Sequence, residues 1–300
     1  MKKLLLLIAV LLLCLPMVLG EENTVVIEKK TYDASLEELN LKNVKIKDIE
    51  ALEKALANMP NLKYVDMSYC GLKYEKLAEL REKWKQEGVK IVWTVTMGPH
   101  TCKTDATAFS TLNDSNATRY GEKTYDPLKY CTELRALDLG HNWIFDISFI
   151  EPMTELRVLV LSDNRITDIS VLEGKPLEYL EMFNNRTKDI SCLKDCTTLI
   201  DVNLCNTHVG DLSILRDLPN LKRVWMGDID ELTKQEINAF LEVKGDSLEA
   251  YNFTTKYPTM YGWRENERYE IIKAIFKEGV YMDFNTVLRP DQYVYLHGKK

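Results

Sequence analysis

The stretch LRALDLGHNWIFDISFI at residues 134–150 recurs as LRVLVLSDNRITDISVL at residues 156–172, 22 residues later. Further copies begin at Leu177, Leu199 and Leu221, each 21 or 22 residues after the one before. All share the spacing L-x-x-L-x-L at their start, with Val or Met at some of the Leu positions. Self-similarity at a fixed period predicts a solenoid, because no single copy can bury its apolar side chains alone.

Two longer copies precede the regular ones and begin at Leu36 and Leu62. Their additional residues predict helices at 50–58 and 74–87, where the later copies have room only for a short turn. Residues 89–97 are rich in β-formers and predict a further strand. Each copy would then contribute one short strand to a parallel sheet whose neighbouring strands lie ~4.8 Å apart.

This spacing is typical of leucine-rich repeats, and the chain resembles bacterial, internalin-like leucine-rich repeat proteins, best over residues 131–228. Two other stretches, 104–110 and 262–265, resemble segments of secreted repeat proteins from Gram-positive-type bacteria. The fold class that we predict is an α/β solenoid: a leucine-rich repeat horseshoe with a parallel concave β-sheet, helical N-terminal repeats and a C-terminal cap. By analogy, the resemblance also implies protein–protein recognition on the concave sheet. The chain departs from internalins in its few repeats and its Thr-rich interruption.

The N-terminus predicts export. Lys2 and Lys3 precede an apolar run that is shorter than the ~20 residues needed to span a bilayer. Short side chains lead to Gly20, which is typical of a secretory signal peptide cleaved after that glycine. We therefore expect a secreted or cell-surface protein that does not remain inserted in a membrane.

The repeat and its breaks predict five regions in the chain. They are a signal peptide at 1–20, long N-terminal leucine-rich repeats at 21–97, a Thr-rich interruption or degenerate repeat at 98–130, regular repeats of 21–22 residues at 131–228, and a C-terminal cap region at 229–300. In the last region, residues 233–243 and 268–277 predict amphipathic helices that cover the final repeat. Its many aromatic residues fit either packing within a cap or a carbohydrate-binding patch.

The charge balance disfavours some classes of partner. The chain has 46 acidic and 39 basic residues and a formal net charge of −7. This excess of acid argues against nucleic acid and anionic lipid as partners. Paired C-x-x-C motifs are absent from the sequence and its four histidines are scattered, so we predict no metal site and no cofactor.

Polar residues that recur at the repeat period are interpreted as parts of the scaffold. Asn142, Asn164 and Asn185 share one position, where their amides would satisfy backbone groups at the turn leaving each strand. The recurrent Asp-Ile-Ser or Asp-Leu-Ser would cap the next turn. Its aspartates are Asp146, Asp168, Asp189 and Asp211.

The cysteines are expected to be mostly free thiols, although the protein is predicted to be exported. Cys131, Cys192 and Cys196 fall at core positions of the repeat, where cysteine behaves as a small hydrophobe. Cys205 is expected to project from the concave strand, and Cys102 lies in the interruption.

No catalytic residue is predicted, and we expect the chain not to be an enzyme. Residues 245–248 spell Gly-Asp-Ser-Leu, the nucleophile block of one esterase family, but they follow a predicted helix instead of an early strand. That family's later Asp-x-x-His is missing, since Asp291 and His297 are six residues apart. His141 and Asp163 occupy the same repeat position and would lie close together, which is more often a solvated contact than a catalytic one.

The concave sheet is the surface that we predict to bind a partner. Its outward positions alternate with the core leucines, and several carry Tyr, Trp, Phe or Arg, which commonly anchor interfaces. The predicted partner-binding residues are Arg135, Asp138, Arg157, Tyr179, Glu181, Phe183, Asp201, Asn203, Arg223 and Trp225.

The function that we predict is an extracellular interaction module that recognises a protein, or a glycan, through the concave face. Tyr179, Phe183 and Trp225 would form its centre, and the charged neighbours would set specificity. Two alternatives stay open. One is a hydrolase whose site lies in the C-terminal region or the interruption, and the other is a purely structural envelope protein.

Overall fold

The computed structural model describes residues 23–111 and 118–292, which form two compact units that meet in sequence between Ile91 and Val92. The predicted signal peptide at 1–20 lies outside the described residues. Both units are built from copies of a strand followed by a helix or turn. The fold is therefore the leucine-rich repeat solenoid that the spacing of the leucines predicts.

The first unit contains the two long repeats. A hairpin of β1 (Thr24–Ile27) and β2 (Lys30–Asp33) precedes a sheet in the order β3-β4-β5. The remaining elements of the unit are β3 (Glu38–Asn40), α1 (Ile49–Ala57), β4 (Tyr64–Asp66), α2 (Tyr74–Lys85) and β5 (Lys90–Val92). Both predicted helices are confirmed within two residues at each end, and Asp48 caps α1 by accepting a hydrogen bond from the Ala51 N–H at 2.9 Å.

The second unit is built on a seven-stranded parallel sheet in the order β14-β13-β12-β11-β10-β9-β8. The strands are β8 (Ala108–Ser110), β9 (Ala136–Asp138), β10 (Val158–Val160), β11 (Tyr179–Glu181), β12 (Asp201–Asn203), β13 (Arg223–Trp225) and β14 (Ala250–Asn252). Leu137, Leu159 and Leu180 pair in register and are fully buried. The repeat spacing therefore becomes a continuous core.

Short turns return the chain from each strand to the next. They are η2 (Ser148–Ile150), η3 (Ser170–Leu172), η4 (Ser191–Asp195) and α4 (Ser213–Asp217). Before each turn an aspartate accepts a hydrogen bond from a serine N–H two residues later, as Asp146 does from Ser148 at 2.8 Å. The structural interpretation of the recurrent Asp-Ile-Ser is thus confirmed.

The Thr-rich stretch contains ordered elements of its own. β6 (Thr94–Met97) and β7 (His100–Lys103) form an antiparallel hairpin, and β8 then joins the edge of the large sheet beside β9. α3 (Glu122–Tyr125) and η1 (Asp126–Tyr130) follow. Because β8 pairs in parallel with the first regular strand, this stretch acts in the structure as a repeat with an irregular sequence.

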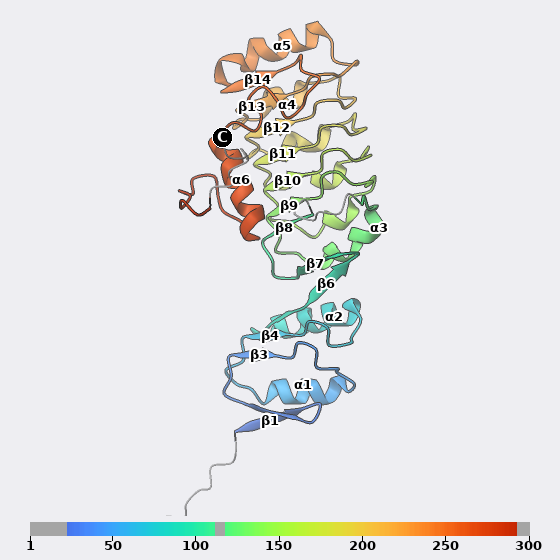
Figure 1. Ribbon diagram of the computed structural model, residues 1–300, viewed down its shortest axis with the longest axis vertical. Helices are drawn as coiled ribbons and strands as arrows, with labels where there is room; N and C mark the ends of the chain where they lie inside the picture. Colours follow the sequence, from blue (N-terminus) through green and yellow to red (C-terminus); the bar gives the residue numbers. More distant parts are fainter. Residues whose placement is uncertain (1–22, 112–117, 293–300) are drawn as a thin grey trace, which may run out of the picture. The chain divides into compact units, whose positions relative to one another are not determined.

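The C-terminal region first adds a strand to the large sheet and then covers the concave face of that sheet. After α5 (Lys234–Lys244) and η5 (Gly245–Ser247), β14 adds one more strand beside β13. Residues 255–292, here called the C-terminal segment, carry α6 (Glu267–Glu278). In Figure 1, α6 lies beside the stacked strands β9 to β12, on the side opposite the short turns. We predicted that this region covers the final repeat. The structure instead places the C-terminal segment over the concave face, where Ile271, Ile272 and Ile275 of α6 are buried against the sheet.

The six cysteines in the described part of the chain are free, and each is buried. Burial raises the pKa of Cys192 and of Cys205 to about 12, so neither thiol is a nucleophile near neutral pH. Cys205 projects from the concave strand as we expected, but it is buried there between the sheet and the C-terminal segment.

Candidate functional site

Strand register assembles the predicted binding face. On each strand of the large sheet, the first and third residues point to the concave side and the second points into the core. Tyr179, Asp201 and Arg223 therefore form one row across neighbouring strands. Glu181, Asn203 and Trp225 form the next row. The repeat spacing placed these side chains on the right face.

We expected these side chains to be exposed, and most are not. Arg135 is exposed and Arg157 is partly exposed, whereas the C-terminal segment buries the other eight. The buried residues are Asp138, Tyr179, Glu181, Phe183, Asp201, Asn203, Arg223 and Trp225. Alternation along a strand determines which face a side chain takes, but it does not reveal that a distant segment covers that face.

Trp263 is the centre of the contact between the sheet and the C-terminal segment. Its ring is fully buried, with centroids 5.3 Å from Tyr179 and 5.4 Å from Trp225. The Arg223 guanidinium lies 5.0 Å from the Trp263 ring centroid and donates to the Trp263 carbonyl at 3.0 Å. Such a packed aromatic cluster with one cation is what anchors many protein interfaces.

Glu181 is the most fully satisfied buried charge on this face. One of its carboxylate oxygens accepts from Trp263 Nε1 at 2.6 Å and from the Tyr179 hydroxyl, and the other accepts from Arg264 at 2.7 Å. Burial lowers the pKa of Arg264, but Glu181, Tyr269 and Tyr179 together raise it by more, so the guanidinium stays charged. The Ser162 hydroxyl also donates to Glu181 at 3.4 Å, so the carboxylate is balanced by one cation and three neutral donors.

Asp201 forms the second buried ion pair. Arg268 donates to both of its carboxylate oxygens at 3.0 Å, and Arg223 approaches one of them at 3.4 Å. Asp201 is fully buried, while the Arg268 side chain keeps 19% of its surface exposed. This bidentate geometry fixes the start of α6 on strand β12.

Two further polar side chains of the predicted set form hydrogen bonds, Asn203 with the C-terminal segment and Asp138 with the edge strand β8. Asn203 donates to the carbonyl of Pro258 at 2.8 Å. Burial raises the pKa of Asp138 to about 6, although the Gly140 N–H and the Ser110 hydroxyl donate to it. The folded protein therefore favours the protonated form of the Asp138 carboxyl more than the unfolded chain does.

The two accessible members of the predicted set lie at the margin of the covered face. Arg157 donates to Glu178 at 2.6 Å, and the Tyr281 hydroxyl donates to the same carboxylate at 3.1 Å. The Arg135 guanidinium lies 5.9 Å from the Tyr281 ring centroid. A partner could reach this margin without moving the C-terminal segment, but it could not reach the aromatic centre.

A second surface follows the strands, at the turns where each strand ends. His141, Asp163, Asn184 and Asn206 share one repeat position there and all have φ between 51° and 59°. The left-handed conformation reverses the chain sharply, and Asn and Asp tolerate it better than most residues. We call this surface the turn face, and it comprises Arg119, His141, Trp143, Asp163, Arg165, Asn184, Arg186, Asn206 and His208.

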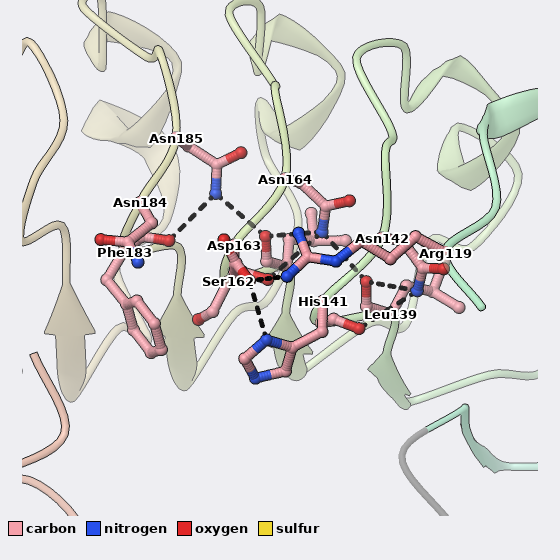
Figure 2. Close-up of polar contacts among 12 residues, drawn as sticks. Arg119, Leu139, His141, Asn142, Ser162, Asp163, Asn164, Phe183, Asn184 and Asn185 are labelled. Atoms are coloured by element: carbon pink, nitrogen blue, oxygen red, sulfur yellow. Dashed lines mark hydrogen bonds and ion pairs between the residues drawn. The ribbon is translucent and has the colours of Figure 1, made fainter. Parts of the chain in front are cut away.

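A ladder of asparagines holds the turn face rigid. The Asn164 amide donates to the carbonyls of Leu139 and Leu161 at 3.0 Å, and its oxygen accepts from the Ile144 N–H at 3.0 Å. Asn185 repeats this arrangement one strand further on, and Figure 2 shows the column of asparagine side chains. The predicted scaffold role of these residues is confirmed.

His141 and Asp163 lie together as their shared position predicts. His141 Nδ1 is 2.9 Å from Asp163 Oδ2, and Arg119 reaches the same oxygen at 2.7 Å (Figure 2). Partial burial raises the pKa of Asp163, but the hydrogen bonds and charges of His141 and Arg119 together lower it by more. The net effect is a lowered pKa, so the carboxylate is charged. Within the described ranges, no serine, threonine or cysteine side chain hydrogen-bonds His141.

The turn face contains an open groove of about 350 Å³. Its lining includes Arg119, Trp143, Asp163, Arg165, Arg186 and His208. Trp143 keeps 51% of its surface exposed, and the Arg165 guanidinium lies 5.5 Å from its ring centroid. The sequence analysis singled out the asparagine column and the His141–Asp163 pair here, but it missed Trp143, Arg165, Arg186 and His208, which recur at one repeat position.

The geometry gives little support to a hydrolase site at Ser247 or to a metal site. The Ser247 hydroxyl donates to the Lys244 carbonyl at 2.8 Å, on an exposed turn after α5. In the part of the chain that the structure covers, no group of three or more His, Cys, Asp and Glu side chains is arranged to hold a metal ion. Of the helices at 23–111 and 118–292, none combines the length and apolar character needed to cross a membrane.

Comparison with known families and curated proteins supports the repeat assignment. A family model for two copies of the leucine-rich repeat matches residues 154–195, which lie in the regular part of the solenoid. No curated protein matches the chain.

Solved structures with a similar fold include two internalins from Listeria monocytogenes. One internalin (inlF) is 21% identical with a TM-score of 0.39, and the match covers 75% of this chain and 56% of that one. Internalin C2 is 20% identical with a TM-score of 0.41, and the match covers 75% and 86%. The leucine-rich repeats of FLRT2, in an octameric complex with Latrophilin 3 and Unc5D, give a TM-score of 0.42 at 15% identity, covering 76% and 72%.

Proposed function

We propose that this chain is an extracellular interaction module that binds a protein partner and catalyses no reaction. The leucine-rich repeats at 154–195 support the binding role, because stacked repeats offer a rigid and extended surface. The apolar N-terminus, with Lys2 and Lys3 before it, supports export.

The observation that carries the proposal is that the concave face already holds a polypeptide. Trp263 packs between Tyr179 and Trp225, and Arg268 pairs with Asp201. These are the aromatic and arginine contacts that anchor protein interfaces, here made within one chain. The surface chemistry of this solenoid therefore suits protein better than a small molecule.

With the C-terminal segment in place, a partner must use the surfaces left open. Releasing the segment would leave Glu181 and Asp201 without their cationic partners, and a buried charge that loses its partner is strongly destabilising. We therefore place partner binding on the turn face and on the margin around Arg135 and Arg157. The other eight predicted concave residues contact a partner directly only if the segment moves away.

A binding experiment with purified material tests the module. The chain comprising residues 21–300 is immobilised and exposed to extracellular proteins and glycans from its natural surroundings. A captured protein is then purified, and its affinity for the free chain is measured in solution. A saturable affinity for one protein supports the proposal. Exclusive capture of glycans, or no capture at all, contradicts it.

The hydrolase alternative has a direct test. Because no histidine among residues 23–111 and 118–292 hydrogen-bonds Ser247, and its hydroxyl donates to the Lys244 carbonyl, we expect no turnover of ester, peptide or glycan substrates. Turnover that disappears in the Ser247→Ala variant would instead locate a hydrolase site at this turn.

A further inference from the structure

The turn face has a charge opposite to that of the whole chain. The chain carries a net charge of −7, yet the groove presents Arg119, Arg165 and Arg186 around a single carboxylate, Asp163. Asp163 is already neutralised by Arg119 and by contact with His141. The groove is thus a local positive site on an acidic protein.

Two of these arginines are available to a partner. Arg165 and Arg186 are exposed, and in the described part of the chain neither side chain forms an ion pair. They occupy the same position in neighbouring repeats, so their backbones are about one strand spacing, ~4.8 Å, apart. A planar guanidinium donates two parallel hydrogen bonds to one carboxylate, so this pair suits a ligand with carboxylates in sequence.

An aromatic side chain supplies the apolar part of the same site. Trp143 is half-exposed at one end of the groove, with Arg165 against its ring. Burying this ring against a partner would remove apolar surface from water and would strengthen the neighbouring ion pairs. Trp and Arg together are the residues most enriched at the energetic centres of protein interfaces.

We propose that the turn face binds an acidic segment of a protein partner, with Arg165 and Arg186 pairing with its carboxylates and Trp143 packing against it. This inference rests on the proposed function and adds the site and the partner's chemistry. The asparagine ladder beneath keeps the groove in one shape, so binding requires little ordering of the module.

The test uses the full chain and synthetic probes. The probes are a peptide of Glu-Gly repeats, the same peptide with Gln in place of Glu, and polygalacturonate as an acidic glycan. The variants are Arg165→Glu with Arg186→Glu, and Trp143→Ala. The control is Lys30→Glu with Lys234→Glu, which makes the same change in net charge at two exposed residues that do not line the groove. Circular dichroism verifies that each variant is folded.

The glutamate peptide should bind the wild type more tightly than the glutamine peptide, with an affinity that falls as salt rises. The double arginine variant should lose at least about tenfold in affinity and Trp143→Ala about fivefold, while the lysine control stays within about twofold. The inference is overturned if the glutamate peptide does not bind, if the arginine variant binds it equally well, or if polygalacturonate binds more tightly. If a natural partner still binds the double arginine variant, the proposed binding function stands, but the turn face is not its site.

Discussion

Trp263 Nε1 donates a hydrogen bond to Glu181 Oε2 at 2.6 Å, although 82 residues separate the two in sequence. Glu181 lies at the centre of the concave sheet, and Trp263 begins the part of the C-terminal segment that leads into α6. The contact joins the repeat scaffold to its cover, and it explains why an acidic side chain is fully buried in the middle of the sheet.

Loss of the Trp263 donor should destabilise the fold even when the ring is largely kept. Trp263→Phe leaves Glu181 one hydrogen bond short in a buried site, so we expect a loss of about 1–3 kcal/mol in the free energy of unfolding. Trp263→Ala also removes the packed ring, and we expect about 3–5 kcal/mol. Urea unfolding measures both, and the exposed Trp143→Phe serves as the control. Equal urea midpoints for the wild type and Trp263→Phe would show that the hydrogen bond from Trp263 to Glu181 does not stabilise the fold.

The Arg268–Asp201 pair should behave as a coupled unit. Arg268→Met leaves Asp201 buried with only the more distant Arg223, and we expect a loss of about 3–5 kcal/mol. Replacing Asp201 with Asn in the same chain removes the stranded charge. The double variant should therefore be more stable than Arg268→Met alone, in a urea double-mutant cycle. Additive losses would show that the two side chains do not interact.

Gly227 should not tolerate a methyl group. A Cβ at this position would lie 2.1 Å from the carbonyl oxygen of Thr255, where the chain starts its return across the sheet. Gly227→Ala should therefore cost about 1–3 kcal/mol, because Thr255 backbone atoms must move. Gly245→Ala meets its nearest atom at 3.8 Å and should stay within about 0.5 kcal/mol. Thermal unfolding compares the two, and a neutral Gly227→Ala would place residue 255 elsewhere.

Asp138 should make stability depend on pH. Its pKa is about 6 in the folded chain against the ordinary 3.8, because it is buried. The folded state binds this proton more tightly, so the stabilisation is present below about pH 4 and is lost as pH rises through 6. Asp138→Asn keeps the shape without the charge. It should be more stable than wild type by up to about 3 kcal/mol at pH 8 and nearly equal at pH 4. The same difference at both pH values would refute this assignment.

The sequence predicted most of the scaffold. The spacing of Leu134, Leu156 and Leu177 determined the strand register, because a one-residue shift would expose every core side chain. The recurrence of Asn142 and Asn164 was enough to predict the ladder. β14 was missed because Tyr251 and Phe253 stand where earlier copies have aliphatic residues, so the copy that begins at Leu248 did not match the pattern.

The sequence did not predict what covers the concave face. Trp225 and Phe183 at outward positions indicated a buried contact, but alternation could not tell a partner from the chain itself. The missing signal was Trp263 with Arg264, in a stretch that we compared with other secreted repeat proteins without assigning it a role. Pairing of these residues with Glu181 depends on long-range folding, which local patterns do not contain.

The most direct test locks the C-terminal segment onto the sheet. Thr107 Oγ1 accepts from the Tyr281 N–H at 3.0 Å, so Thr107→Cys with Tyr281→Cys brings two thiols within reach of a disulfide. Affinity for the captured protein partner is measured on the oxidised and reduced forms, with Thr107→Cys alone as the control. Binding away from the covered face predicts equal affinity for both forms. Binding that is lost on oxidation and returns on reduction would show that the partner takes the place of the segment on the concave sheet.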